Sequence, residues 1–284
     1  MTALRKIVFP LPLGWVAIAC LLAMTACDSP PQGGASGQQD ESASIAVYRH
    51  AMDGAPTSLD PAQASNIYAN FIAVNLFDTL YRYKYLARPY RLEPNLAEGL
   101  PQVSADGLIY TIRNKPGVHI IDDPAFPEGK GRALRAADFV YSIKRHFDPA
   151  MRAQGAWLWQ GRIVGLDEWK EDGADYDQEV PGLRALDDRT VQIQLIAPFP
   201  QLPHTLAHGL SAIVPREAVE AYGLEFAVRP VGSGPFRLAE FNSSRAVLLR
   251  NERFRKEPFD LATEGFDPAR QSGLGLERLE DRAP

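Results

Sequence analysis

The sequence predicts a mixed α/β fold that follows an exported leader. Its 284 residues are 45% hydrophobic and 23% charged, which is typical of ordinary globular domains. After the leader, segments with alternating apolar side chains and segments with apolar side chains three or four residues apart follow one another. Because predicted strands and helices are interspersed rather than grouped, a β-sandwich and a helical bundle are both disfavoured.

The first residues have the layout of a secretory signal. A basic start at Arg5 and Lys6 precedes a largely apolar run over 7–26. Cys27 directly follows Thr-Ala, which resembles the lipobox of bacterial lipoproteins, with Met24 at the position where that pattern usually has leucine. We expect residues 1–26 to be a lipoprotein signal peptide and Cys27 to be the acylated first residue of the mature chain.

Two alternatives stay open for this leader. About twenty apolar residues can span a bilayer, so the run could be an uncleaved anchor, or it could be a plain signal peptide. Pro10 and Pro12 disfavour a long helix. Cys20 competes as the lipidation site, but the apolar run continues through Leu21 and Leu22. In each case the rest of the chain is exported.

After cleavage before Cys27, Cys20 is lost and Cys27 is acylated, so no thiol pair remains; this excludes a disulfide, a cysteine metal site and a cysteine nucleophile. Removing residues 1–26 takes away two of the 30 basic residues and none of the 35 acidic ones. The mature chain is therefore acidic and has no long cationic runs, which argues against a nucleic-acid partner.

The body of the chain begins after a flexible stretch. Residues 27–44 are rich in Pro, Gly, Gln and Ser without an apolar period, and we expect a tether there. A short strand is predicted over 45–48, ended by the turn residues that follow. An amphipathic helix with a Ser or Asn cap is predicted over 65–81. Its apolar stripe consists of Ile67, Phe71, Val74, Phe77 and Leu80.

Further elements follow in order. The turn residues Asp106-Gly107 precede a predicted strand over 108–113, and a helix is predicted over 135–147 with basic residues near its end. The later elements are a strand over 190–195, a short helix from Pro215 to Gly223, and a hairpin of 236–241 with 246–249. The stretch 157–181 is rich in acids and Gly, and we expect it to be an irregular excursion outside the core.

Motifs of catalysis are missing from the sequence. It contains no Walker loop and no Gly-x-Ser-x-Gly elbow. His204 and His208 have the four-residue spacing of metal ligands on a helix, but Thr205 stands where a zinc protease has Glu, and no third ligand is evident. We therefore interpret them as surface or core histidines and predict no metal and no cofactor.

Two further groups could bind ligands but have simpler interpretations. The loop acids could bind calcium, yet they lack the alternating pattern of a calcium loop, so solvated turn residues are favoured. They are Asp122, Asp123, Asp172, Asp175, Asp177, Asp187 and Asp188. Trp157 and Trp159 could line a pocket, but we favour a core residue and its rim.

Six segments, in unbroken order, resemble bacterial extracellular solute-binding proteins of family 5, which serve oligopeptide, dipeptide and nickel importers. The segments are 57–61, 75–80, 92–98, 104–113, 137–145 and 230–236. One such match would be weak, but six in order behind a lipoprotein leader are specific. We interpret all six as scaffold rather than as ligand contacts. The glycines of 232–235, for example, let the backbone pass close to a neighbour.

The resemblance implies a periplasmic-binding-protein-like fold of type II, in which two lobes close on a ligand by a hinge motion. By position, residues 45–60 and 183–260 would form the first lobe, and 61–182 an inserted domain. Residues 261–284 would begin the crossover into a second lobe, and that lobe is expected to be missing from this chain.

The resemblance also implies where a ligand would be held. Cleft residues carried over by position lie between the first strand and the segment 57–61. They are His50, Met52, Asp53, Ala55, Pro56 and Thr57. In peptide-binding relatives this loop supplies an acidic residue, and here Ala55 stands at the expected position with Asp53 nearby.

The function implied is that of a periplasmic substrate-binding component of an ABC importer, which is not an enzyme. Its partners would be an oligopeptide or a similar small solute, the permease subunits, and the membrane through a lipid anchor. Asp28, after Cys27, resembles a signal for retention at the inner membrane. The alternative is an exported cell-envelope hydrolase on the same fold, which would need a nucleophile with a base, a metal, or paired carboxylates.

Overall fold

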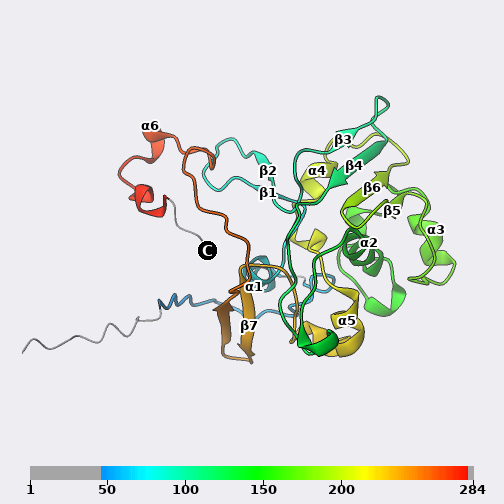
Figure 1. The fold of residues 1–284 in the computed structure, drawn as a ribbon, viewed down its shortest axis with the longest axis horizontal. Helices are drawn as coiled ribbons and strands as arrows, with labels where there is room; N and C mark the ends of the chain where they lie inside the picture. Colours follow the sequence, from blue (N-terminus) through cyan, green and yellow to red (C-terminus); the bar gives the residue numbers. More distant parts are fainter. Residues whose placement is uncertain (1–45, 65, 281–284) are drawn as a thin grey trace, which may run out of the picture. The chain divides into compact units, whose positions relative to one another are not determined.

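The computed structural model describes residues 46–64 and 66–280 (Figure 1). The signal peptide, Cys27 and the tether lie outside the described residues. Contacts divide the chain after His50, so residues 46–50 are considered by themselves. They are exposed and belong to no strand, with the rings of Tyr48 and His50 stacked at a centroid distance of 6.4 Å. The strand predicted over 45–48 is therefore wrong for its described residues.

The described part of residues 51–280 contains three antiparallel sheets. The first pairs β1 (Tyr81–Tyr83) with β2 (Leu92–Pro94), and the last pairs β7 (Phe236–Phe241) with β8 (Ala246–Arg250). The second has four strands in the order β3-β4-β6-β5. These strands are β3 (Gln102–Val103), β4 (Ile109–Arg113), β5 (Leu183–Ala185) and β6 (Thr190–Gln194).

Helices and single helical turns connect the strands. The α-helices are α1 (Ile67–Leu76), α2 (Ala136–Arg145), α3 (Leu166–Glu171), α4 (Leu202–Thr205), α5 (Arg216–Tyr222) and α6 (Pro268–Gln271). The 3₁₀ turns are η1 (Pro127–Gly129), η2 (Pro149–Met151), η3 (Ala156–Leu158), η4 (Gly209–Ser211), η5 (Gly223–Ala227) and η6 (Leu276–Leu279). The mixed α/β architecture predicted from the sequence is confirmed.

The helix α1 differs from its prediction in length and in the face it buries. Asn66 caps it by accepting from the backbone N–H of Ala69 at 2.8 Å, and the chain turns extended at Phe77. The predicted stripe is exposed along the helix itself, with Ile67 at 64% and Val74 at 62% exposure. The buried side chains are instead Ala69, Ile72, Ala73 and Leu76. Because both faces are apolar, periodicity could not select the buried face.

The helix α2 packs against β5 and β6 of the four-stranded sheet (Figure 1). Phe139 and Ile143, on the apolar face of this helix, are fully buried, as its amphipathic pattern requires. The predicted turn at Asp106-Gly107 connects β3 to β4, with Gly107 at a φ of +71°. The predicted strand over 190–195 corresponds to β6, so this part of the core followed directly from the sequence.

The stretch 157–181 contributes to the core, which corrects its prediction as an irregular excursion. It contains α3, and Trp159, Leu166 and Trp169 are all buried in the main cluster of apolar side chains. Some acids of this stretch lie on α3 beside its buried residues, and the others lie in the turns and irregular chain that follow the helix. The composition of this stretch therefore gave no sign that three of its side chains belong to the core.

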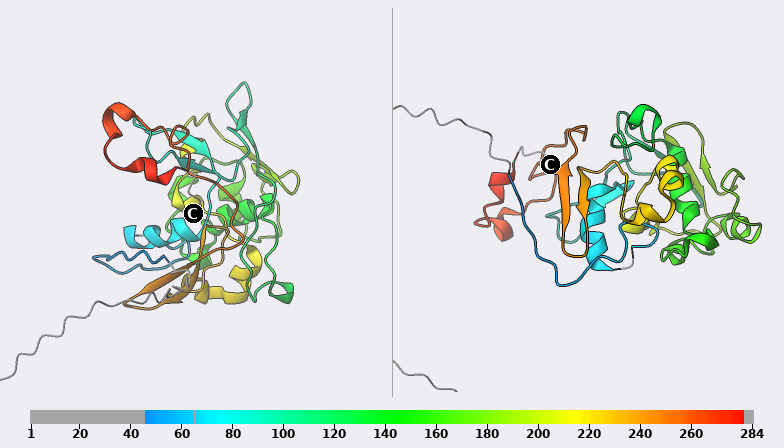
Figure 2. Two further views of the ribbon diagram at one scale, coloured as in Figure 1. Left: turned by 60° about the vertical axis from the view of Figure 1, so that its left-hand side comes forward. Right: turned by 90° about the horizontal axis from the view of Figure 1, so that it is seen from below.

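The glycine segment before β7 passes close to α1, as predicted. A Cβ on Gly232 would lie 2.2 Å from the carbonyl oxygen of Leu76, and one on Gly234 would lie 2.6 Å from that of Asn75. The N–H of Gly234 donates to the Leu76 oxygen at 3.0 Å. β7 consequently lies beside α1 (Figure 2).

The domain limits expected from the resemblance remain a prediction. The four-stranded sheet pairs β4 with β6, although a limit between 182 and 183 would separate them. We therefore propose that the inserted domain extends through Gln194, because strands that share a ladder of hydrogen bonds belong to one folded unit.

Candidate functional site

A groove of about 610 Å³ opens between α1, the β1–β2 hairpin and the segment that follows β8. Its lining includes five aromatic residues, which we call its walls, and a group of polar and charged side chains, which we call its floor. The aromatic residues are Phe77, Tyr83, Tyr85, Phe254 and Phe259. Apolar walls with a few convergent polar groups are typical of sites for small solutes.

The floor of the groove is a buried hydrogen-bonded cluster around Asp78. Arg255 binds this carboxylate through two nitrogens, with Nη1–Oδ2 at 2.8 Å and Nη2–Oδ1 at 3.0 Å. Ser233 donates to Asp78 Oδ2 at 2.8 Å, and Asn95 donates to Oδ1 at 3.2 Å. Arg255 Nη2 also donates to Asn95 Oδ1 at 2.8 Å. The paired geometry fixes the orientation of the guanidinium.

Three of the segments that carried the family resemblance meet at this floor. Asp78 comes from 75–80, Asn95 from 92–98 and Ser233 from 230–236. The sequence interpretation treated these segments as scaffold alone. Their polar side chains also shape the groove, because Asp78 and Asn95 line it.

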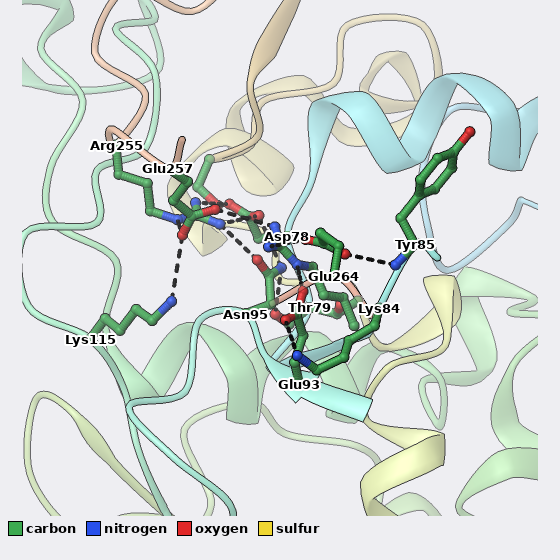
Figure 3. A network of polar contacts seen from close by, with 12 residues as sticks. Asp78, Thr79, Lys84, Tyr85, Glu93, Asn95, Lys115, Arg255, Glu257 and Glu264 are labelled. Atoms are coloured by element: carbon green, nitrogen blue, oxygen red, sulfur yellow. Dashed lines mark hydrogen bonds and ion pairs between the residues drawn. The ribbon is translucent and has the colours of Figure 1, made fainter. Parts of the chain in front are cut away.

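Glu257, beside the floor, is contacted by three cations, of which Arg255 and Lys115 are labelled in Figure 3. The distances to its carboxylate oxygens are 2.6 Å from Arg255 Nε, 3.3 Å from Arg82 Nη1 and 3.5 Å from Lys115 Nζ. Burial by itself would raise the pKa of Glu257, but Arg255, Arg82 and Lys115 outweigh it and hold that pKa below its ordinary value. The carboxylate is therefore charged at neutral pH.

The same network extends to the hairpin. Arg82 Nε binds Glu93 at 2.6 Å, and Lys84 Nζ lies 3.7 Å from the other oxygen of Glu93. Glu264 accepts from the backbone N–H of Tyr85 at 2.7 Å and lies 3.6 Å from Arg82 Nη2. Figure 3 shows Lys84, Glu93 and Glu264 near Asp78 and Asn95. The segment after β8 is thereby attached to β1–β2.

The charges of the network balance. Its cations are Arg82, Lys84, Lys115 and Arg255, and its carboxylates are Asp78, Glu93, Glu257 and Glu264. Four positive charges thus face four negative ones. The network is therefore neutral overall, and five of its charged residues line the groove, namely Asp78, Arg82, Arg255, Glu257 and Glu264.

The rim carries further aromatic contacts. The Tyr83 hydroxyl lies 2.9 Å from His204 Nδ1, and the rings of Tyr85 and Phe259 meet edge to face with centroids 6.4 Å apart. His208 has a different role, because its Nδ1 accepts from the backbone N–H of Leu210 at 3.1 Å. Both histidines therefore have local structural partners. Within the described ranges, no three His, Cys, Asp or Glu side chains converge as metal ligands.

The residues from Met52 to Thr57 that were predicted to contact ligand do not line this groove. Met52 packs partly buried against the core, and the Ala55 carbonyl accepts from the Asn66 side chain at 3.0 Å. Asp53 and Thr57 are exposed. Pro56 is half-buried, and His50 belongs to the separately described residues 46–50. Their role at a ligand stays a prediction.

The predicted loop acids are turn residues. Asp122 pairs with Lys130, Asp123 caps Ala125, and Asp187 accepts from the N–H of Arg189. Trp159 is fully buried and Trp157 is 62% exposed, so the interpretation as a core residue and its rim is confirmed.

The residues of the groove network escaped the sequence interpretation because they are distant in the chain. Lys115 and Glu257 are 142 residues apart, and Arg82 and Glu257 are 175 apart. One local signal exists, since residues 81–91 hold four cations and no acid in an otherwise acidic chain. That run predicts carboxylates elsewhere without indicating which ones.

In the part of the chain that the structure describes, no helix combines the length and apolarity needed to cross a bilayer.

Comparisons with known proteins assign the chain to a family. Residues 91–263 match the family described as bacterial extracellular solute-binding proteins, family 5 middle. The glutathione-binding protein GsiB of Pectobacterium atrosepticum is 28% identical over 193 residues, covering 68% of this chain and 32% of that protein. GsiB of Escherichia coli K12 is 27% identical over 194 residues with the same coverage. The chain thus spans about a third of the length of these relatives.

Solved structures with a similar fold include two peptide receptors. Helicobacter pylori DppA, an ABC transporter-associated periplasmic binding protein in complex with the peptide STSA, is 27% identical with a TM-score of 0.56; the match covers 71% of this chain and 38% of DppA. The murein tripeptide binding protein MppA of Escherichia coli is 25% identical with a TM-score of 0.60 over 72% and 38% of the two chains. This chain belongs to the family 5 bacterial extracellular solute-binding proteins and has the mixed α/β fold of type II periplasmic binding proteins.

Proposed function

We propose that this protein is the periplasmic substrate-binding component of an ABC importer and that it captures short peptides or peptide-like solutes. The observation that carries the proposal is the family match over 91–263, which includes four of the eight charged residues of the groove network. The proteins named above are binding proteins rather than enzymes, and the solutes in their names are glutathione, a murein tripeptide and the peptide STSA.

The chemistry of the groove supports a peptide-like solute. Aromatic walls can cover apolar side chains, and a floor with both signs of charge can pair with the charged ends of a short peptide. The groove volume of about 610 Å³ falls in the range of sites that bury small ligands.

The location and partners are further parts of the proposal. Acylation of Cys27 would hold the protein at the membrane, facing the periplasm, with the inner membrane favoured by Asp28. Permease subunits would then accept the solute. In a complete receptor of two lobes, the loop with Met52, Asp53, Ala55, Pro56 and Thr57 would contribute to the cleft, and closure would bury the solute between both walls.

Calorimetry on the full chain tests the proposed function. We would titrate it with glutathione, a murein tripeptide and the peptide STSA, and follow each solute by mass spectrometry. We expect saturable binding of at least one solute and intact solute afterwards. A folded protein that binds none of the three, or that hydrolyses any of them, contradicts the proposal.

A further inference from the structure

Glu257 lies on a segment without helix or strand, yet it is contacted by cations from other parts of the chain. It lies on residues 255–260, which belong to no helix or strand, between the end of β8 and the turn at 261–265. Three cations from three separate parts of the chain contact it. Arg82 comes from β1, Lys115 follows β4, and Arg255 follows β8. Glu257 and two of these cations line the groove.

The three cations do not depend equally on Glu257. Arg255 keeps its two bonds to Asp78 and its bond to Asn95, so its guanidinium would stay oriented without Glu257. Arg82 likewise keeps Glu93 at 2.6 Å. Lys115 has Glu257, at 3.5 Å, as its ion-pair partner among the described residues. Arg82 and Arg255 thus keep carboxylate partners without Glu257, whereas Lys115 has no other ion pair among the described residues.

We propose that Arg82, Lys115 and Arg255 form a carboxylate-binding site in the groove, and that Glu257 occupies it as an internal substitute for the carboxylate of a solute. This inference rests on the proposed function, because it names the part of a peptide that the groove recognises. The solute class is a molecule with a free carboxylate, such as the C-terminal end of a short peptide.

The charge balance of the network supports one incoming carboxylate. With Glu257 in place, four cations face four carboxylates. When Glu257 moves out, one positive charge is left without compensation next to Lys115 and Arg82. A singly charged carboxylate restores neutrality, whereas an amide does not.

The backbone around Glu257 permits the exchange. No regular element has to break when residues 255–260 shift, and Pro258 and Phe259 lie against the groove rather than inside the core. The next fixed point is Glu264, which is buried and accepts from the N–H of Tyr85 at 2.7 Å. The segment can therefore move between Arg255 and Glu264 while both ends stay attached.

An internal substitute lowers the apparent affinity for a solute, because only the fraction of molecules with a vacant site can bind. Replacing Glu257 by the isosteric amide should remove this competition. We expect the variant Glu257→Gln to bind N-acetyl-trialanine, which carries one carboxylate, at least about tenfold more tightly than the unchanged protein. The C-terminal amide of the same peptide should show no gain.

The experiment compares full-length chains by calorimetry, with folding verified by thermal melting. Glu225→Gln is the matched control, because Glu225 pairs with Arg229 at the surface, outside the residues that line the groove. The double variant Lys115→Met/Glu257→Gln should lose the gain. If Glu257→Gln fails to fold, Glu257→Asp replaces it in the test, because its shorter side chain keeps the charge but withdraws the carboxylate from the cations. We expect this variant to show a smaller gain in affinity for the free-acid peptide and none for its amide.

An equal gain for the acid and the amide, an equal gain in Glu225→Gln, or no gain in either Glu257 variant overturns the inference. The outcome is separable from that of the proposed function. A selective gain in Glu257→Gln without capture of any peptide by the unchanged protein supports this site and leaves the transport role unsupported. If the protein binds peptides with an affinity that changes neither in the Glu257 variants nor on amidation of the peptide, the transport role is supported and this site is refuted.

Discussion

The molecule holds two ion-pair systems of opposite design. In the first, Arg145 at the end of α2 binds Asp60 through two nitrogens at 2.9 and 2.5 Å, and both side chains are at most 3% exposed. In the second, the groove network, Glu257 is shared among three cations whose exposure ranges from 14% to 43%. The first is closed and one-to-one, and the second is open and shared.

The difference shows which charges can exchange partners. A buried pair loses its hydration on folding and recovers the cost only with its one partner, so it can only hold elements together. Here it joins the segment 57–61 to α2. Partly exposed charges can trade a protein partner for water or for a solute at little cost. The groove network is therefore suited to binding, and the Asp60–Arg145 pair to stability.

The largest expected effect comes from breaking the buried pair. Arg145→Met would leave the Asp60 carboxylate buried without its cation, and we expect a loss of about 3–5 kcal/mol in the free energy of unfolding. Urea unfolding measures this. Arg229→Met, at a surface pair with Glu225, is the matched control and should change stability by less than about 0.5 kcal/mol. A loss in Arg145→Met as small as in the control would remove the distinction between the two systems.

The second effect is a pH dependence confined to the closed region. Burial, aided by the neighbouring charge of Arg145, lowers the pKa of His146 to about 4, although its hydrogen bond to the Leu210 carbonyl opposes this. The unfolded chain takes up a proton near pH 6.5, before the folded chain does. The neutral imidazole therefore stabilises the fold fully above pH 6.5, and this stabilisation is lost as the pH falls towards 4.

To measure it, we would compare the free energy of unfolding of the unchanged protein with that of His146→Gln at pH 7.5 and pH 4. We expect the unchanged protein to lose about 3 kcal/mol more than the variant over this range. Carboxylates titrate in both proteins and cancel in the difference. Equal losses of stability in the two proteins would show that folding does not lower the pKa of His146.

The smallest effect is expected in the groove. Lys115→Met makes the same kind of change as Arg145→Met, but Lys115 is 35% exposed and its pair with Glu257 spans 3.5 Å. We expect a loss below about 1 kcal/mol in urea unfolding, which shrinks further in 0.5 M salt because exposed charges are screened. A loss of several kcal/mol, unaffected by salt, would place this network with the closed system instead.

Some features of the fold could be predicted because they depend on local physics. Alternation predicted β6, the hairpin β7–β8 followed from two apolar runs around a polar turn, and the glycines before β7 indicated a close backbone approach. For α1 the same reasoning chose the wrong face, because apolar residues lie on more than one face of the helix and only its neighbours decide which side is buried.

The sequence by itself determined the mixed α/β class, the order of most elements and the family, since these follow from periodicity, turn residues and ordered motifs. The groove and its charges were decided only by the tertiary structure. Lys115, Arg82 and Glu257 form one site because three segments that are far apart in the chain fold to the same place, and no local pattern encodes that meeting. Short-range spacing specifies elements, whereas long-range packing selects which side chains become partners.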